Sequence, residues 1–108
     1  MNLEMAALEL SEELQGENPP QLLDVREVEE HEFVALPESK LIPLGELQGR
    51  VAELAEWKDR EVVVYCHHGI RSLHAIRFLR GEGFSKLRNL SGGIHAWACE
   101  VDQEMKKY

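Results

Sequence analysis

Cysteine is scarce in this sequence: its 108 residues include only Cys66 and Cys99, and neither belongs to a Cys-x-x-Cys pair. Two separate cysteines are too few for the disulfide framework of a small secreted domain. We therefore expect a cytoplasmic protein in a reducing compartment. The N-terminus lacks the positively charged segment that opens a signal peptide. No apolar run is long enough to span a bilayer, so we expect no membrane partner.

Basic residues are also in the minority, with twelve lysines and arginines against twenty aspartates and glutamates, for a formal net charge of −8. A nucleic-acid partner is therefore not expected, because neutralising phosphates requires clustered basic side chains. The charge is uneven. Residues 1–39 hold eleven acidic side chains and one basic one, Arg26, whereas residues 71–88 hold five basic side chains and one acidic one, Glu82. A local positive field around the cysteine loop can therefore exist on an acidic molecule, although Arg77, Arg80 and Lys86 are interpreted as solvated charges on helix faces.

The most informative segment runs from Val62 to Ser72 and reads Val-Val-Val-Tyr-Cys-His-His-Gly-Ile-Arg-Ser. A β-branched run ends at Cys66, and a helical pattern begins after Arg71, which predicts a strand, a tight loop and a helix. The N–H groups of such a loop and the N-terminus of the helix form a cradle for anions. This cradle stabilises a thiolate, the reactive form of cysteine. The segment thus predicts a cysteine nucleophile that handles an anion.

The length of the loop distinguishes two chemistries. A Cys–Arg loop one residue longer would make a wider cradle, suited to the equatorial oxygens of a phosphoryl group. Here only four residues separate Cys66 from Arg71. The tighter ring leaves room for one extra atom on the cysteine sulfur, and Gly69 permits backbone conformations that a side chain would forbid. The spacing favours a persulfide over a phosphoryl group.

Hydrophobic periodicity predicts alternating strands and helices along the chain. The predicted strands cover residues 21–25, 40–42, 61–65 and 87–90, and the predicted helices cover residues 5–14, 27–32, 44–57, 72–79 and 94–97. This alternation indicates an α/β fold with a mainly parallel sheet covered by helices on both faces, in one domain over residues 1–108. Ligands bind such sheets at the carboxyl ends of the strands, where we expect Cys66.

Three segments together resemble the signatures of the rhodanese family of thiosulfate sulfurtransferases. They are Leu22-Leu23-Asp24-Val25-Arg26-Glu27, Val64-Tyr65-Cys66-His67-His68-Gly69-Ile70-Arg71-Ser72 and Asn89-Leu90-Ser91-Gly92-Gly93-Ile94-His95-Ala96-Trp97. The resemblance implies a three-layer fold with a sheet of about five strands. It also implies transfer of a sulfane sulfur, through a persulfide on Cys66, from thiosulfate or another persulfide donor to a thiol, a carrier protein or cyanide.

The resemblance assigns roles to individual residues. Cys66 is the expected nucleophile, and Asp24 and Arg26 are expected to be structural residues near the site. The expected substrate-binding residues complete the loop: His67, His68, Gly69, Ile70, Arg71 and Ser72. Arg71 would attract the small anionic donor, because a cation at a helix N-terminus is unfavourable unless it faces an anion.

No metal or other cofactor is expected, because two adjacent loop histidines rarely converge on one metal and no second ligand pair has suitable spacing. His31, His74 and His95 are interpreted as surface or packing residues. Cys99 could resolve a persulfide on Cys66 as an internal disulfide, but it is interpreted as a packing residue, since nothing around it in the sequence would acidify its thiol.

Two alternatives to the enzyme remain open. The chain could be a non-catalytic rhodanese-like binding or sulfur-carrier module, although such modules commonly lack the cysteine that this chain retains. It could also be a small cysteine-dependent phosphatase, which the short loop disfavours.

Overall fold

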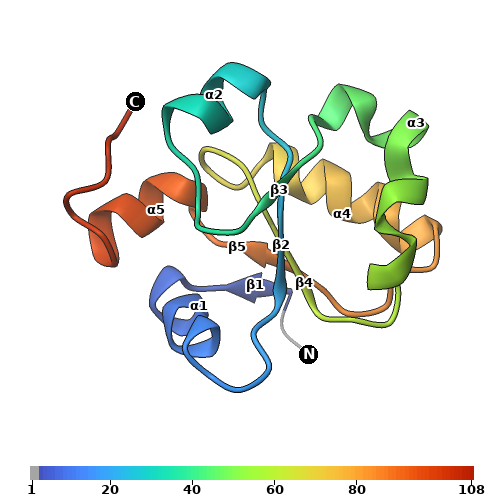
Figure 1. Ribbon diagram of the computed structural model, residues 1–108, viewed down its shortest axis with the longest axis horizontal. Helices are drawn as coiled ribbons and strands as arrows, with labels where there is room; N and C mark the ends of the chain where they lie inside the picture. Colours follow the sequence, from blue (N-terminus) through green and yellow to red (C-terminus); the bar gives the residue numbers. More distant parts are fainter. Residues whose placement is uncertain (1–2) are drawn as a thin grey trace.

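The computed structural model describes residues 3–108, which build a five-stranded sheet flanked by helices (Figure 1). The strands lie in the order β1-β5-β4-β2-β3, and each neighbouring pair is parallel. Their bounds are Glu4–Met5 for β1, Gln21–Asp24 for β2, Lys40–Leu41 for β3, Val62–Tyr65 for β4 and Leu87–Leu90 for β5. The predicted α/β fold with a parallel sheet is confirmed.

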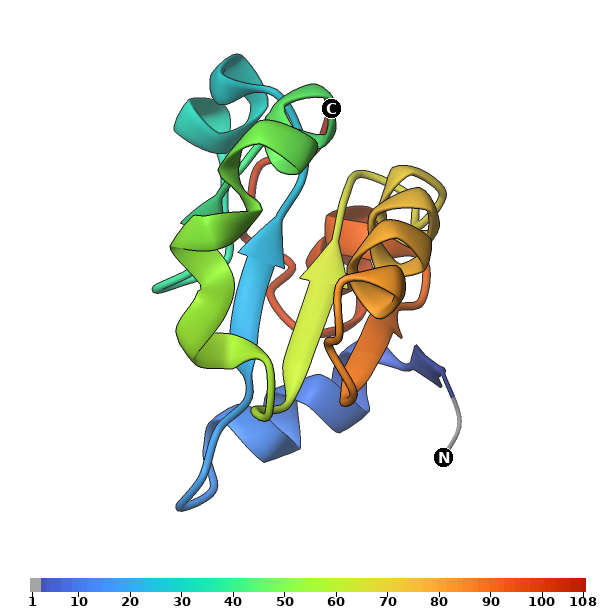
Figure 2. The ribbon, with the colours of Figure 1, turned by 90° about the vertical axis from the view of Figure 1, so that its right-hand side faces the viewer.

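The helical segments follow the strands in the predicted alternation. The α-helices are α1 Ala7–Leu14, α2 Val28–Phe33, α3 Leu47–Arg50, α4 Arg71–Gly81 and α5 Gly93–Glu100, and the 3₁₀ segments are η1 Leu44–Glu46 and η2 Val51–Trp57. Figure 2 shows α3 and α4 on one side of the sheet, with α1 and α5 on the other. None of the helices described is long and apolar enough to cross a bilayer.

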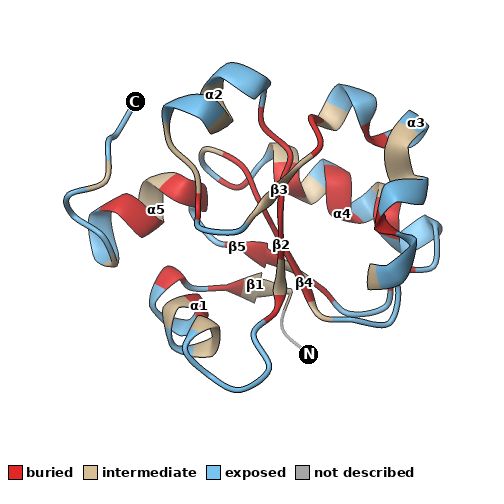
Figure 3. Ribbon diagram, in the orientation of Figure 1, coloured by how far each residue is buried: buried red, intermediate tan, exposed pale blue. Residues whose placement is uncertain are grey.

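Strand β4 carries the centre of the core, and all four of its residues are buried (Figure 3). Successive side chains of a strand point to opposite faces of the sheet. Val62 and Val64 accordingly pack with residues of α3 and α4, whereas Val63 and Tyr65 pack with residues of α1 and α5. A strand buried on both faces explains why its sequence is a continuous β-branched run and not an alternating one.

The structure differs from the prediction at two elements. Residues 44–57 are predicted as one helix but form a short α-helix between two 3₁₀ segments. Gly45 and Gly49 lie in this stretch, and each weakens an α-helix relative to alanine. The sequence pattern also missed β1, because a two-residue strand is too short to show a period. Its pairing to β5 relies on backbone bonds, including one from the Asn89 N–H to the Leu3 carbonyl at 2.8 Å.

The strand order brings three chain segments together at one edge of the sheet. Strand β4 lies between β2 and β5, with Asp24 beside Tyr65 and Val64 beside Asn89 in register. Cys66 directly follows Tyr65, so it lies at the carboxyl ends of the central strands. This is the edge at which open parallel sheets bind their ligands.

Candidate active site

The sulfur of Cys66 lies inside the loop that joins β4 to α4. The Gly69 N–H donates to the sulfur at 3.1 Å and the Ser72 N–H at 3.4 Å, and only 1% of Cys66 is exposed. Gly69 makes this turn with a φ of 102°, in the left-handed region that favours glycine. Backbone dipoles therefore converge on the sulfur, an arrangement that stabilises negative charge there.

Ser72 connects the sulfur to strand β5. Its hydroxyl oxygen lies 3.4 Å from Cys66 Sγ and 2.5 Å from Asn89 Oδ1, and the Asn89 amide nitrogen donates to the Gly69 carbonyl at 3.2 Å. A hydroxyl has one proton to donate, so Ser72 can give it either to the amide oxygen or to the sulfur. Sequence reasoning placed Asn89 only in a family signature and did not identify this contact.

Helix α5 holds the loop from the other side. The N–H groups of Ile94 and His95 donate to the carbonyls of Cys66 and His67 at 2.9 and 3.1 Å. These N–H groups belong to the first turn of the helix, which has no intrahelical acceptors for them. Gly93 makes the contact sterically feasible, because a methyl group there would collide with the Cys66 and His67 backbone.

His67 and His68 lie side by side at the surface of the loop, with ring centroids 3.9 Å apart. His95 joins them from α5, with its ring centroid 5.0 Å from that of His68. The Tyr108 ring stacks on His67 at 3.8 Å. Burial and the neighbouring His68 lower the pKa of His67. Sequence reasoning treated His95 as a surface or packing residue, since its distance from the loop along the chain hides its proximity.

Arg71 begins α4 and forms a bidentate ion pair with Glu30 of α2. Its two terminal nitrogens donate to the two carboxylate oxygens at 2.7 and 2.9 Å. These hydrogen bonds lower the pKa of Glu30 to about 2 and raise that of Arg71. Sequence analysis expected Arg71 to face an anion, and in the structure that anion is a carboxylate of the chain itself. Ile70, the residue before Arg71, is 68% exposed.

Tyr108 ends the segment that returns from α5 toward α2 (Figure 1), and it links this ion pair to Arg26. Its hydroxyl donates to Glu30 at 2.7 Å and accepts from Arg26 Nη1 at 2.8 Å. The sequence gives no signal for this contact, because Tyr108 and Glu30 are 78 positions apart.

Asp24 and Arg26 form a buried ion pair at the carboxyl end of β2. Arg26 Nε and Nη2 donate to the two oxygens of Asp24 at 2.9 and 2.7 Å. The Tyr65 hydroxyl donates to the same carboxylate at 3.1 Å, and burial raises the pKa of Tyr65 to about 12. The polar groups of Asp24 and Arg26 are thus hydrogen-bonded within the protein, and Asp24 also lies 2.8 Å from His31 Nδ1.

Cys99 is exposed on α5, so its interpretation as a packing residue is wrong. Its sulfur lies 3.7 Å from His95 Nε2. The last turn of α5 carries it past the edge of the core, into solvent.

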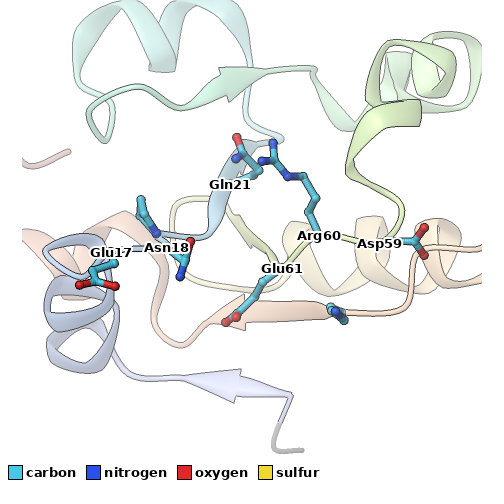
Figure 4. A pocket seen from close by; sticks show the side chains of 8 residues that line it. Glu17, Asn18, Gln21, Asp59, Arg60 and Glu61 are labelled. Atoms are coloured by element: carbon cyan, nitrogen blue, oxygen red, sulfur yellow. The ribbon is translucent and has the colours of Figure 1, made fainter.

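A separate hollow of about 500 Å³ lies at the opposite edge of the sheet, where β2 and β4 begin (Figure 4). Its walls mix both charges, with Arg60 and Lys86 among Glu17, Asp59 and Glu61. The cysteine loop lies at the other ends of the same strands, so this hollow does not belong to the Cys66 site.

Known proteins resemble this chain over nearly its whole length. Residues 6–100 match the family model described as rhodanese-like domain. A sulfurtransferase of Allochromatium vinosum is 36% identical over 89 residues, which cover 82% of this chain and 81% of that protein. The crystal structure of a rhodanese-like domain protein from Staphylococcus aureus superposes with a TM-score of 0.83 at 27% identity, covering 99% of both chains.

A second curated relative is longer than this chain. YrkF of Bacillus subtilis, whose name marks it as a candidate sulfur carrier protein, is 40% identical over 81 residues. The match covers 75% of this chain but only 43% of YrkF.

Proposed function

The chain belongs to the rhodanese-like domain family, and we propose that it is a sulfurtransferase that carries a sulfane sulfur as a persulfide on Cys66. Its relatives include a sulfurtransferase and a candidate sulfur carrier, so sulfur handling is common to both. In the proposal the donor is a small anion such as thiosulfate, and the acceptor is a thiol, a carrier protein or, in an assay, cyanide.

One observation carries the proposal: the Cys66 sulfur accepts hydrogen bonds from two backbone N–H groups of its own loop, at 3.1 and 3.4 Å. Donors that are fixed before the reaction stabilise charge without reorganising during it. The same N–H groups can stabilise a thiolate and, after sulfur is added, a persulfide anion. The tight loop suits a single added atom better than a phosphoryl group.

The first half-reaction charges the cysteine. The Cys66 thiolate attacks the outer sulfur of thiosulfate, and a new S–S bond forms while the S–S bond of the donor breaks. Sulfite leaves with the electron pair of the broken bond. Arg71 assists by attracting the donor, for which it must exchange the Glu30 carboxylate that it now binds.

The second half-reaction removes the sulfur from the Cys66 persulfide. A nucleophilic acceptor attacks the outer sulfur of the persulfide, and Cys66 leaves as the thiolate from which the cycle began. The two half-reactions share no ternary complex, so the kinetics are ping-pong. Rapid discharge defines an enzyme, whereas a stable persulfide that only a partner protein discharges would define a carrier.

Two further parts of the proposal concern the whole chain. We place it in the cytoplasm, because both Cys66 and Cys99 are free thiols and Cys66 must stay reduced between cycles. We also propose that residues 1–108 act as one domain, since the described strands share a single sheet.

The test is steady-state sulfur transfer from thiosulfate to cyanide and to a small thiol, with Cys66→Ser and Cys99→Ser as a matched pair. We expect Cys66→Ser to abolish turnover while circular dichroism shows a folded chain, because a serine oxygen cannot hold the transferred sulfur. Cys99→Ser should keep most of the activity. Retained turnover in folded Cys66→Ser would overturn the proposal.

A further inference from the structure

Three imidazole rings form a cluster beside the cysteine loop. His67 and His68 belong to the loop and His95 to the first turn of α5, and ring nitrogens from all three lie within 4.8 Å of one another. The fold therefore brings together three neutral donor side chains of the kind that bind transition metals. The sulfur transfer proposed above assigns no role to His95.

Two nitrogens of this cluster lack hydrogen bonds. His67 Nε2 and His95 Nδ1 are both buried, and neither has a partner among the residues that the structure describes. Buried side-chain nitrogens are normally satisfied, so each exception calls for an explanation. Two unsatisfied imidazole nitrogens in one cluster point to a ligand that completes them both.

The surroundings hold the rings in place. The backbone bond from the His95 N–H to the His67 carbonyl, at 3.1 Å, ties the two sides of the cluster together. Tyr108 stacks on His67 with an angle of 7° between the rings. His95 Nε2 lies 3.7 Å from Cys99 Sγ, whereas His95 Nδ1 has no partner among the described residues. Such outer contacts orient metal-binding histidines in known sites.

The spacing fits one tetrahedral ion after a small adjustment. Zinc–nitrogen bonds of about 2.0–2.1 Å place two ligand nitrogens about 3.3 Å apart. The present nitrogens, all within 4.8 Å of one another, reach that spacing through modest ring rotations, which the exposed His68 can make. The Glu30 carboxylate beside the loop already binds Arg71 and Tyr108. An all-imidazole set favours zinc, copper or nickel over magnesium or calcium.

We propose that His67, His68 and His95 form a binding site for one divalent transition-metal ion, with Zn²⁺ as the ion to test. Three protein ligands would leave a fourth position open to water or to an anion at the mouth of the Cys66 loop. The proposal does not depend on the sulfurtransferase activity, because its readout is metal binding and not turnover.

The experiment titrates Zn²⁺ into the chelator-stripped full-length chain by isothermal calorimetry. We expect one Zn²⁺ per chain, and at least roughly tenfold weaker binding in each of His67→Ala, His68→Ala and His95→Gln. His74→Ala is the matched control, because His74 is exposed on α4 and lies outside the cluster, and its binding should equal that of the parent. Circular dichroism of each variant checks the fold.

A Co²⁺ titration identifies the ligand atoms. An all-nitrogen site should give the visible bands of tetrahedral Co²⁺ without the near-ultraviolet charge-transfer band of a cobalt–thiolate bond. Three results would overturn the proposal: no Zn²⁺ bound, binding that His95→Gln leaves unchanged, or a thiolate band that Cys66→Ser or Cys99→Ser removes together with the metal.

Discussion

At the scale of single residues, the ion pair between Arg71 and Glu30 determines how the candidate site binds an anionic donor. Both charges are partly exposed, with 37% of the Arg71 side chain and 20% of the Glu30 side chain accessible. A bidentate guanidinium–carboxylate pair is a strong, directional contact. A dianionic donor must therefore compete with a carboxylate that is always present. Glu30 should therefore compete with the donor for Arg71.

This competition predicts opposite effects on the two sides of the ion pair. We expect Arg71→Ala to raise KM for thiosulfate about tenfold, a loss of about 1.4 kcal/mol, with a smaller change in kcat. Glu30→Gln should lower KM, because it frees Arg71 for the donor. Steady-state kinetics of both variants checks this, with Arg77→Ala on the exposed face of α4 as the control. A Glu30→Gln effect that persists in the Arg71→Ala background would contradict the competition.

The same pair predicts a pH dependence of stability. The pKa of Glu30 falls from an ordinary 4.5 to about 2 in the folded chain. A carboxyl with a lowered folded pKa adds stability that is complete above pH 4.5 and is lost as the pH falls toward 2. Because the pair is partly exposed, we expect its contribution to be about 1 kcal/mol.

Urea unfolding of the parent and of Glu30→Gln between pH 7 and pH 2 measures this contribution. The gap between the two free energies of unfolding should be present at neutral pH and close in the acidic range. A gap that stays constant down to the lowest pH would show that Glu30 does not titrate in the way described.

At the scale of elements, the sequence predicted the central strands well because their signal is local. The β-branched run at 62–65 and the loop after it lie within one stretch of chain, so the local residue pattern indicates both. The partners of the loop are not local: Glu30 and Asn89 reach it from positions 41 and 20 residues away. No pattern in the sequence pairs such residues, and only the strand order brings them together.

The contact between α5 and the cysteine loop gives a prediction at this scale. Gly93→Ala adds a methyl group against the Cys66 and His67 backbone, at a residue whose φ is 65°. We expect the free energy of unfolding to fall by about 3 kcal/mol and sulfur transfer to be largely lost, because strain and overpacking act on one loop.

Gly81→Ala is the matched control, since a methyl group at Gly81 on α4 meets no atom within 4 Å. This control should leave activity unchanged and stability equal or higher by about 0.5–1 kcal/mol. Chemical denaturation measures the free energy of unfolding of both variants, and a turnover assay measures their sulfur transfer. Equal behaviour of the two substitutions would mean that α5 does not hold the loop.

At the scale of the whole molecule, charges that are far apart along the chain pair with one another in space. The basic segment 71–88 suggested a local positive field, but Arg71 pairs with Glu30, and Arg88 lies near Glu9 and Glu13 of α1. The acidic N-terminal third thus supplies carboxylates to two of these basic residues, Arg71 and Arg88. Sequence analysis could count both sets of charges, but the pairing depends on how the helices lie around the sheet.

The fold therefore serves one small region: the sheet presents the ends of β2, β4 and β5, and α2, α4 and α5 surround the loop that follows β4. Within this region, Cys66 is the residue proposed to hold the transferred sulfur. Kinetics alone cannot locate a sulfur atom, whereas the mass of the protein can.

The most direct test is intact-mass spectrometry of the chain after incubation with thiosulfate in the absence of an acceptor, followed by peptide mapping. We predict one added sulfur atom on the peptide that contains Cys66, its removal by cyanide, the same result for Cys99→Ser, and no addition to Cys66→Ser. Sulfur found on Cys99, or turnover by a chain on which Cys66 never gains sulfur, would contradict the account.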